Sequence, residues 1–143
     1  MSANSEARSP LKILIVEDNR DARTALRMRL TIAHGHTVYE AADGASGVQC
    51  ALERKPDVAL IDLGLPDIDG GEVARRIREV LDRRAILLVA LTGYATAEDQ
   101  RRAREAGFDV YLVKPVEQSE LVAILDNHAS RKLTAIDNEK EQE

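Results

Sequence analysis

The stretch Ile13-Leu14-Ile15-Val16-Glu17-Asp18-Asn19, which reads ILIVEDN, runs four apolar residues directly into two carboxylates. A short run of branched apolar side chains without polar alternation is typical of a strand that is buried on both faces. The two acids therefore follow a strand that belongs in the interior. This order predicts a covered parallel sheet with negative charge at one edge.

Four apolar runs share this character and predict buried strands. They are short, rich in branched side chains and almost free of polar residues, and they span residues 11–16, 58–61, 86–91 and 110–113. A fifth segment, 37–42, mixes Val38 and Tyr39 with Glu40, and this mixture fits an edge strand better than a central one.

Between these runs, apolar residues recur at helical spacing. The stripes are Ala22, Leu26 and Leu30; Val48, Ala51 and Leu52; Val73, Ile77 and Leu81; and Leu121, Ile124, Leu125 and His128. The segment 96–106 has a stripe made only of alanines, so we expect this helix to be loosely held. Strand and helix alternate five times, which predicts an α/β fold: a doubly wound (βα)5 parallel sheet with right-handed crossovers.

Length and composition favour one soluble domain. We expect a disordered N-terminal segment over 1–10, the folded domain over 11–129, and a helix end with a disordered tail over 130–143. The polar start lacks the apolar region of a signal peptide, and no run is long enough to span a membrane, which favours the cytoplasm. The net charge of -5 argues against nucleic acid as a direct partner. The single cysteine, Cys50, excludes an internal disulfide.

Functional groups follow the predicted strands at their carboxyl ends, where open α/β sheets bind ligands. These residues are Glu17, Asp18, Asp62, Thr92 and Lys114. Three crowded carboxylates repel one another unless a cation lies among them. Mg²⁺ fits this set because it takes one or two carboxylates and completes its shell with water and phosphate oxygens, and Mn²⁺ is an acceptable substitute.

Asp62 closes the run DVALID and precedes the turn Gly64-Leu65-Pro66-Asp67. An aspartate carboxylate can attack phosphorus and form an acyl phosphate. Lys114 would then hold one phosphoryl oxygen, and Thr92 would donate a hydrogen bond to the group once it is attached. The residue types therefore predict phosphoryl transfer to Asp62.

These residues resemble the receiver domain of two-component response regulators, over residues 12 to about 125. The matching motifs are VEDN, LIDLGLPDIDG, LTGY and YLVKP, in this order and on the expected elements. The resemblance implies a flavodoxin-like sheet with strand order 2-1-3-4-5, as in the chemotaxis regulators of this family. The stretch LTGYATAEDQRRAREAGFDVYLVKPV looks especially like the receivers of hybrid histidine kinases.

The resemblance also implies roles for individual residues. Asp62 would accept a phosphoryl group from a phosphohistidine, and Glu17, Asp18 and Asp62 would bind Mg²⁺ together with the backbone carbonyl of Gly64. Thr92 and Tyr111 would form the switch pair. The Lys114–Pro115 peptide is expected to be cis, which proline makes accessible. Because Gly64 lacks a side chain, we expect the lifetime of the aspartyl phosphate to change in a Gly64→Asn variant.

Simpler structural roles exist for each residue taken alone. Asp18 or Asn19 fits as the cap of the first helix. Asp62 fits as a turn aspartate, and Thr92 with Gly93 fits as a turn. Tyr111 fits as a surface residue of the last strand. Asp67, Asp69, Gly70 and Gly71 are interpreted as turn and helix-start residues without a chemical role.

The leading function is a phosphorylation switch that catalyses only its own phosphorylation and dephosphorylation and is not otherwise an enzyme. Its expected partners are a histidine kinase or histidine phosphotransfer protein and a downstream protein, with a phosphorylation-dependent homodimer as a further option. Three alternatives stay open: an interaction module that is never phosphorylated, a flavoprotein of the same fold, and a magnesium phosphatase. Glu17 and Asp18 disfavour a flavin phosphate, and Gly64 stands where such a phosphatase would have a second aspartate.

Overall fold

The computed structural model describes residues 10–93 and 96–128 of the chain. The described residues divide into a large unit that ends at Pro115 and a smaller unit that starts at Val116. The large unit contains β1 (Lys12–Val16), α2 (Arg20–His34), β2 (Thr37–Ala41), α3 (Gly44–Arg54), β3 (Val58–Asp62), α4 (Gly70–Arg78), β4 (Leu87–Thr92), α5 (Ala97–Ala106) and β5 (Val110–Val113). The smaller unit has a helix over 118–128. Except for residue 10, the terminal segments predicted over 1–10 and 130–143 lie outside the described residues.

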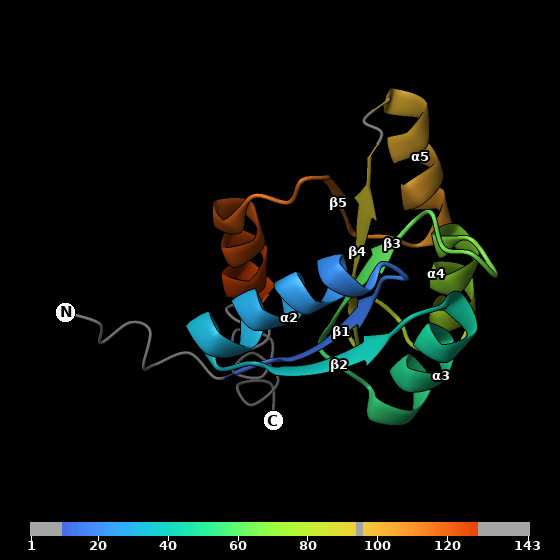
Figure 1. Cartoon of the computed structure of the whole chain (residues 1–143). Coiled ribbons are helices and arrows are strands. Elements are labelled where there is room, and N and C mark those ends of the chain that lie inside the picture. The colour runs from blue at the N-terminus through green and yellow to red at the C-terminus, as the bar shows by residue number, and fades with distance from the viewer. Residues whose placement is uncertain (1–9, 94–95, 129–143) are drawn as a thin grey trace, which may run out of the picture. The chain divides into compact units, whose positions relative to one another are not determined.

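The five strands form one parallel sheet in the order β2-β1-β3-β4-β5 (Figure 1). This order confirms the predicted doubly wound, flavodoxin-like fold, including the edge position of β2. The register pairs Val16 of β1 with Ala41 and Ile61. The first and third strands therefore end side by side, which brings the residues that follow them to one edge of the sheet.

Local sequence accounts for the start of each helix in the large unit. The N-cap residues are Asn19, Asp43, Asp69 and Thr96. The side chain of each accepts a hydrogen bond from a backbone N–H of the first turn. Asn19, and not Asp18, caps α2, with its Oδ1 2.9 Å from the N atom of Ala22. Asp18 is therefore left available at the sheet edge.

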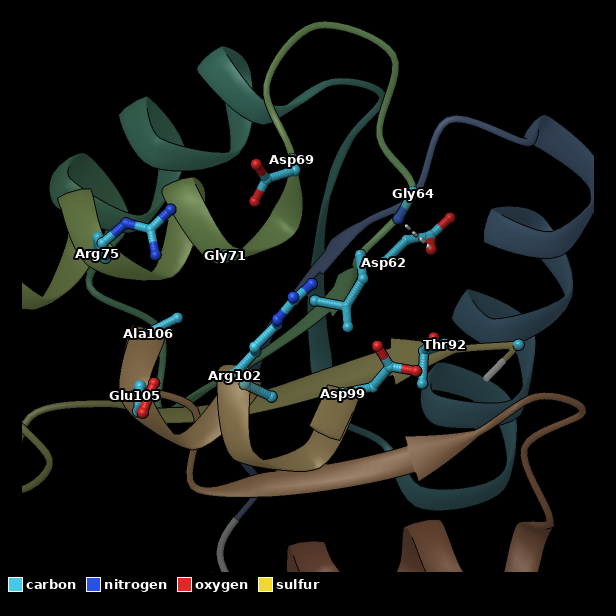
Figure 2. Close-up of a pocket in the computed structure, with 13 residues that line it drawn as sticks. Asp62, Gly64, Asp69, Gly71, Arg75, Thr92, Asp99, Arg102, Glu105 and Ala106 are labelled. Atoms are coloured by element: carbon cyan, nitrogen blue, oxygen red, sulfur yellow. Dashed lines mark hydrogen bonds between the residues drawn. The ribbon is translucent and has the colours of Figure 1, made fainter. Parts of the chain in front are cut away.

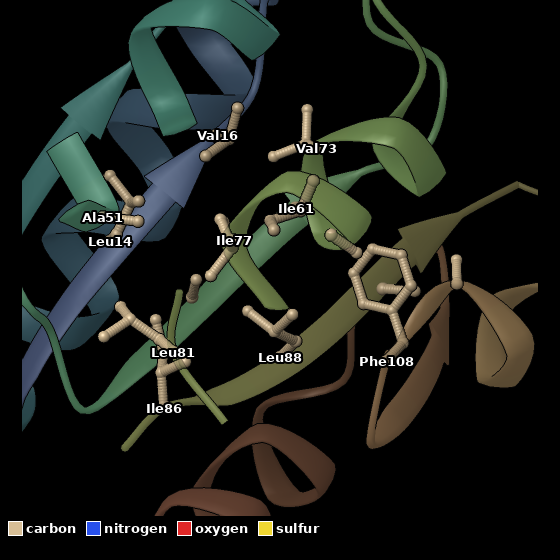
Figure 3. Packing of buried hydrophobic residues seen from close by; sticks show 14 of the residues in the cluster. Leu14, Val16, Ala51, Ile61, Val73, Ile77, Leu81, Ile86, Leu88 and Phe108 are labelled. Carbon is tan, nitrogen blue, oxygen red and sulfur yellow. The ribbon is translucent and has the colours of Figure 1, made fainter. Parts of the chain in front are cut away.

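The main hydrophobic core lies between one face of the sheet and the helices α3, α4 and α5. Alternate strand residues such as Leu14, Ile61 and Leu88 are fully buried there, against Ala51 of α3 and Ile77 of α4 (Figure 3). Leu81, predicted on the helical stripe, is buried but lies beyond the end of α4, because that helix ends at Arg78.

Helix α2 belongs to the opposite side of the sheet, as a doubly wound fold requires (Figure 1). Its residues Leu26 and Leu30 are buried, and so are Ile13 and Ile15, whose side chains alternate with those of the main core.

In the smaller unit, Leu121 and Leu125 are buried. Among the residues that the structure describes, no helix is long and apolar enough to cross a membrane.

The helix α5 buries only alanines, which confirms the composition of its predicted stripe. Ala103 and Ala106 are its buried residues. Its outer face carries ion pairs within the helix, such as Arg101 with Glu98 and Glu105. Exposed pairs of this kind contribute little to stability. That the helix is loosely held stays a prediction.

Candidate functional site

The carboxyl edge of the sheet brings together the acidic side chains that the sequence placed at strand ends. Glu17, Asp18 and Asp62 each offer a carboxylate oxygen, and these three oxygens all lie within 4.8 Å of one another. Glu17 and Asp62 are buried, with 3% and 8% of their surface exposed, whereas Asp18 is exposed. The cluster is thus half enclosed and open on the side of Asp18.

Lys114 enters this cluster from the end of β5. Its Nζ lies 2.9 Å from Oε1 of Glu17 and 3.1 Å from Oδ2 of Asp62. The peptide bond between Lys114 and Pro115 is cis, as the resemblance implied. The ammonium group therefore bridges two acids that come from different strands.

The electrostatics of the site reflect its burial. Burial raises the pKa of the Glu17 carboxyl, and the hydrogen bonds from Lys114 and from the Asn19 N–H oppose this rise without cancelling it. Burial by itself would lower the pKa of the Lys114 ammonium, but its hydrogen bonds to Glu17 and Asp62, together with the negative charges of these two acids, outweigh burial and raise that pKa. Lys114 is accordingly held as a cation.

One ammonium does not balance three carboxylates, so the cluster suits a further cation. All the side-chain ligands are carboxylate oxygens, the donors that hard divalent ions such as Mg²⁺ select. Asp18, on the open side, leaves room for water molecules in the ion's shell. The residues present therefore fit a magnesium ion.

The loop after β3 supports the orientation of Asp62. The backbone N–H of Gly64 donates a hydrogen bond to Oδ1 of Asp62, 3.0 Å away (Figure 2). Asp62 thus has one oxygen directed to this loop and the other to Lys114. A Cβ atom added at Gly64 would meet only Asp62 Oδ1, at 3.8 Å, so the position has room for a side chain beside the carboxylate.

Thr92 is the last residue of β4 and is buried. It lies beside Asp62, the last residue of the neighbouring strand β3 (Figure 2). The register pairs Asp62 with Leu91, one residue before Thr92. Tyr111 lies on β5 opposite Ala90 and is half-buried against the main core. Partial burial is compatible with the switch role of Tyr111 and with its alternative interpretation as a residue packed at the surface, and both stay predictions.

A cavity of about 640 Å³, which the strand-end pattern of the sequence does not predict, adjoins Asp62 and Thr92. Gly71 and Arg75 of α4 line one side, and residues of α5 such as Arg102 line the other (Figure 2). Small side chains on both helices leave this space. The signal in the sequence is the alanine-only stripe of α5, because such small side chains leave space beside the helix.

Comparison with known families identifies the chain. Residues 13–126 match the model of the response regulator receiver domain. The chain belongs to this family. Receiver domains of two-component systems accept phosphoryl groups at an aspartate and interact with histidine kinases or phosphotransfer proteins.

Among curated relatives, this receiver is 43% identical over 105 residues to the transcriptional regulatory protein AfsQ1 of Streptomyces coelicolor, covering 73% of this chain and 45% of that protein. It is 35% identical over 128 residues to the transcriptional regulatory protein KdpE of Mycobacterium tuberculosis, covering 90% of this chain and 55% of that protein. The chain thus spans about half the length of these relatives.

Among solved structures, a CheY-like receiver domain protein from Methanospirillum hungatei JF-1 superposes with a TM-score of 0.80 at 27% identity, covering 89% of this chain and 99% of that one. The receiver domain of the sensor histidine kinase PA1611 from Pseudomonas aeruginosa PAO1 superposes with a TM-score of 0.76 at 33% identity, covering 85% and 99%. The latter holds a magnesium ion coordinated in its active-site cleft.

Proposed function

We propose that this receiver is a phosphorylation switch in which Asp62 accepts a phosphoryl group from a phosphohistidine of a histidine kinase or histidine phosphotransfer protein. The observation that carries the proposal is the buried Asp62 carboxylate, held between the Gly64 N–H and the Lys114 ammonium beside two further acids. A merely structural aspartate needs no such company, because the crowded charges cost stability.

In the proposed reaction, one carboxylate oxygen of Asp62 attacks phosphorus and the bond between phosphorus and the histidine nitrogen breaks, so that its electron pair stays with the imidazole. Lys114 holds a phosphoryl oxygen, and its charge opposes the negative charge that gathers there. Mg²⁺ would be held by Glu17, Asp18 and Asp62 with the Gly64 carbonyl, and when bound it would supply charge neutralisation at the phosphoryl group. Hydrolysis of the aspartyl phosphate resets the protein, which turns over no other substrate.

The switch itself rests on Thr92 and Tyr111. Once a phosphoryl group is attached to Asp62, the Thr92 hydroxyl donates a hydrogen bond to it, and Tyr111 adjusts with Thr92. Such contacts favour the active arrangement only if they are stronger there than in the inactive arrangement. The shift in the equilibrium equals this difference in interaction free energy. The readout is a changed protein-binding surface on β4, α5 and β5, recognised by a downstream protein or a second copy of this chain.

The test is phosphorylation by a small-molecule phosphodonor, followed by intact mass measurement. The wild-type protein should gain one phosphoryl group in the presence of Mg²⁺, whereas the Asp62→Asn variant and a magnesium-free sample should not. A Thr92→Ala variant should still gain the group but lose phosphorylation-dependent partner binding. No gain by the wild type, under conditions that modify another receiver, would favour an interaction module that works without phosphorylation.

A further inference from the structure

The loop between β3 and α4, residues 63–69, contains Gly64 and is attached to the start of helix α3. The loop closes on itself through a hydrogen bond from the Gly70 N–H to the Leu63 carbonyl oxygen, with an N···O distance of 3.2 Å. Asp67, in the middle of the loop, accepts hydrogen bonds from the backbone N–H groups of Gly44 and Ala45, at 2.8 and 2.9 Å. These two residues precede Asp67 by more than twenty positions.

Two carboxylates therefore accept hydrogen bonds from the first turn of α3, and they have different structural roles. Asp43, the N-cap residue, accepts from the Ser46 N–H at 2.8 Å and belongs to the helix itself. Asp67 takes the two N–H groups before it and belongs to the loop. N–H groups at a helix start are unsatisfied within the helix and favour negative charge, so each carboxylate finds a ready partner.

The same contact has an apolar half. Ile68 is half-buried against the main core, and a Cβ atom placed on the buried Gly44 would overlap the Ile68 side chain. Only a glycine at position 44 lets the loop lie this close to α3. The loop is thus held by Asp67 through hydrogen bonds and by Ile68 through close packing against Gly44.

From this geometry we infer that Asp67 is a positioning residue for the magnesium site: it holds the loop so that Gly64 is in place to orient Asp62 and to offer its carbonyl to the ion. The inference rests on the proposed function, in which Mg²⁺ binds at Glu17, Asp18 and Asp62. The connection runs from Asp67 back through Pro66 and Leu65 to Gly64, whose N–H donates a hydrogen bond to Oδ1 of Asp62.

If the loop is released, only a fraction of molecules presents the complete site, and the apparent affinity for the ion falls by that fraction. We expect Asp67→Ala to weaken ion binding about three- to tenfold by this mechanism. Gly44→Ala, whose Cβ would overlap Ile68 and also Val73 of α4, should displace the loop and act in the same direction. Asp67→Asn keeps one good acceptor and should fall between Asp67→Ala and the wild type.

Asp43→Ala is the matched control because it removes a carboxylate from the same helix start without touching the loop. It should lower the melting temperature, since an N-cap is lost. If Asp67 merely stabilised α3, the two variants would behave alike. If Asp67 positions the loop, only Asp67→Ala should weaken ion binding and speed hydrogen exchange of the Gly64 amide.

The experiment titrates each protein with Mn²⁺ while free Mn²⁺ is followed by electron paramagnetic resonance, and then displaces the bound ion with Mg²⁺. Wild-type affinity in Asp67→Ala and Gly44→Ala, or an equal loss in Asp43→Ala, would overturn the inference. If Asp67→Ala does not fold, Gly44→Ala and Asp67→Asn decide the question against the same control. Failure of the proposed function looks different: the wild type itself would bind no ion and gain no phosphoryl group.

Discussion

Two clusters of charged side chains lie at opposite ends of the same sheet, and they differ in their balance of positive and negative charge. At the carboxyl edge, Glu17, Asp18 and Asp62 share the single ammonium of Lys114. At the amino edge, Asp109 pairs with Arg78 and, at 3.4 Å, with Arg83. The first cluster has an excess of negative charge, and the second has at least one cation for its acid.

The amino-edge cluster is also fully hydrogen-bonded. Arg78 donates to the carbonyl oxygens of Gly107 and Ile86, both at 2.9 Å, and the Leu88 N–H donates to Asp109 at 2.9 Å. Arg78 thereby ties the end of α4 to the residue before β4 and to the segment after α5. This difference in charge balance supports a structural role for the amino-edge cluster and the proposed chemical role for the carboxyl-edge cluster, whose excess of negative charge suits a further cation.

The largest expected effect comes from breaking the balanced cluster. Arg78→Ala leaves Asp109 mostly buried without its main partner and should lower the free energy of unfolding by about 3 kcal/mol. Urea denaturation measures the change. Arg76→Ala is the control, because Arg76 is exposed and pairs only along the helix with Glu72 in the described contacts, so it should cost less than about 1 kcal/mol. Equal losses in the two variants would refute the structural role of Arg78.

The next effect separates the two clusters by their response to magnesium. Lys114→Met removes the only ammonium that the described contacts place between Glu17 and Asp62, and should cost about 1 to 2 kcal/mol, since Lys114 is about one-third exposed. An ion at ten times its dissociation constant adds about 1.4 kcal/mol to any protein that binds it only when folded. Because its three carboxylates have lost their ammonium, Lys114→Met should bind Mg²⁺ more tightly and gain more from the ion than the wild type does, and urea denaturation with and without Mg²⁺ should show this recovery.

In Arg78→Ala, Mg²⁺ should add the same increment as in the wild type and repair nothing at the amino edge. Lys12→Met, at an exposed position at the start of β1, should match the wild type in both conditions. If Mg²⁺ does not raise the free energy of unfolding of Lys114→Met, this result would argue against a cation site among these acids.

A smaller effect has the opposite sign. Asp62→Asn removes one of three repelling carboxylates but keeps an oxygen for the Gly64 N–H, and should raise the free energy of unfolding by about 1 kcal/mol when no magnesium is present. The gain should shrink as Mg²⁺ is added, because the wild type binds the ion better. If Asp62→Asn lowers the free energy of unfolding in urea without magnesium, the negative charge of the carboxyl-edge cluster is already balanced, as it is in the amino-edge cluster.

The fold and the acid cluster could be predicted because both have local signals. Buried parallel strands are continuous apolar runs, and the residues after them meet at one edge, so Glu17, Asp62 and Lys114 could be grouped from the sequence alone. The ends of elements were less certain: Asp62 and Thr92 are the last residues of their strands rather than the residues after them.

Contacts between distant segments had no such signal. Asp67 was interpreted as a turn residue, and nothing near it indicates that its partners are Gly44 and Ala45. Arg78 and Asp109 are separated by 31 positions, and nothing in the sequence near either residue indicates the other. Their pairing depends on how α4 and β5 are placed by the core, which sequence patterns do not encode locally.

The smallest expected effect concerns Asp67 and acid. The N–H groups of Ala45 and Gly44 lower the pKa of its carboxyl from an ordinary value of 3.8 to about 2. A carboxyl whose pKa is lower in the folded state contributes stability above its unfolded pKa, and this contribution is lost as the pH falls through its folded pKa. The advantage of the wild type over Asp67→Asn should therefore be constant above about pH 5 and shrink between about pH 4 and pH 2. Melting temperatures of both proteins across this range, at one ionic strength, measure the difference. If the difference in melting temperature does not change with pH, the negative charge of Asp67 does not contribute to its contact with α3.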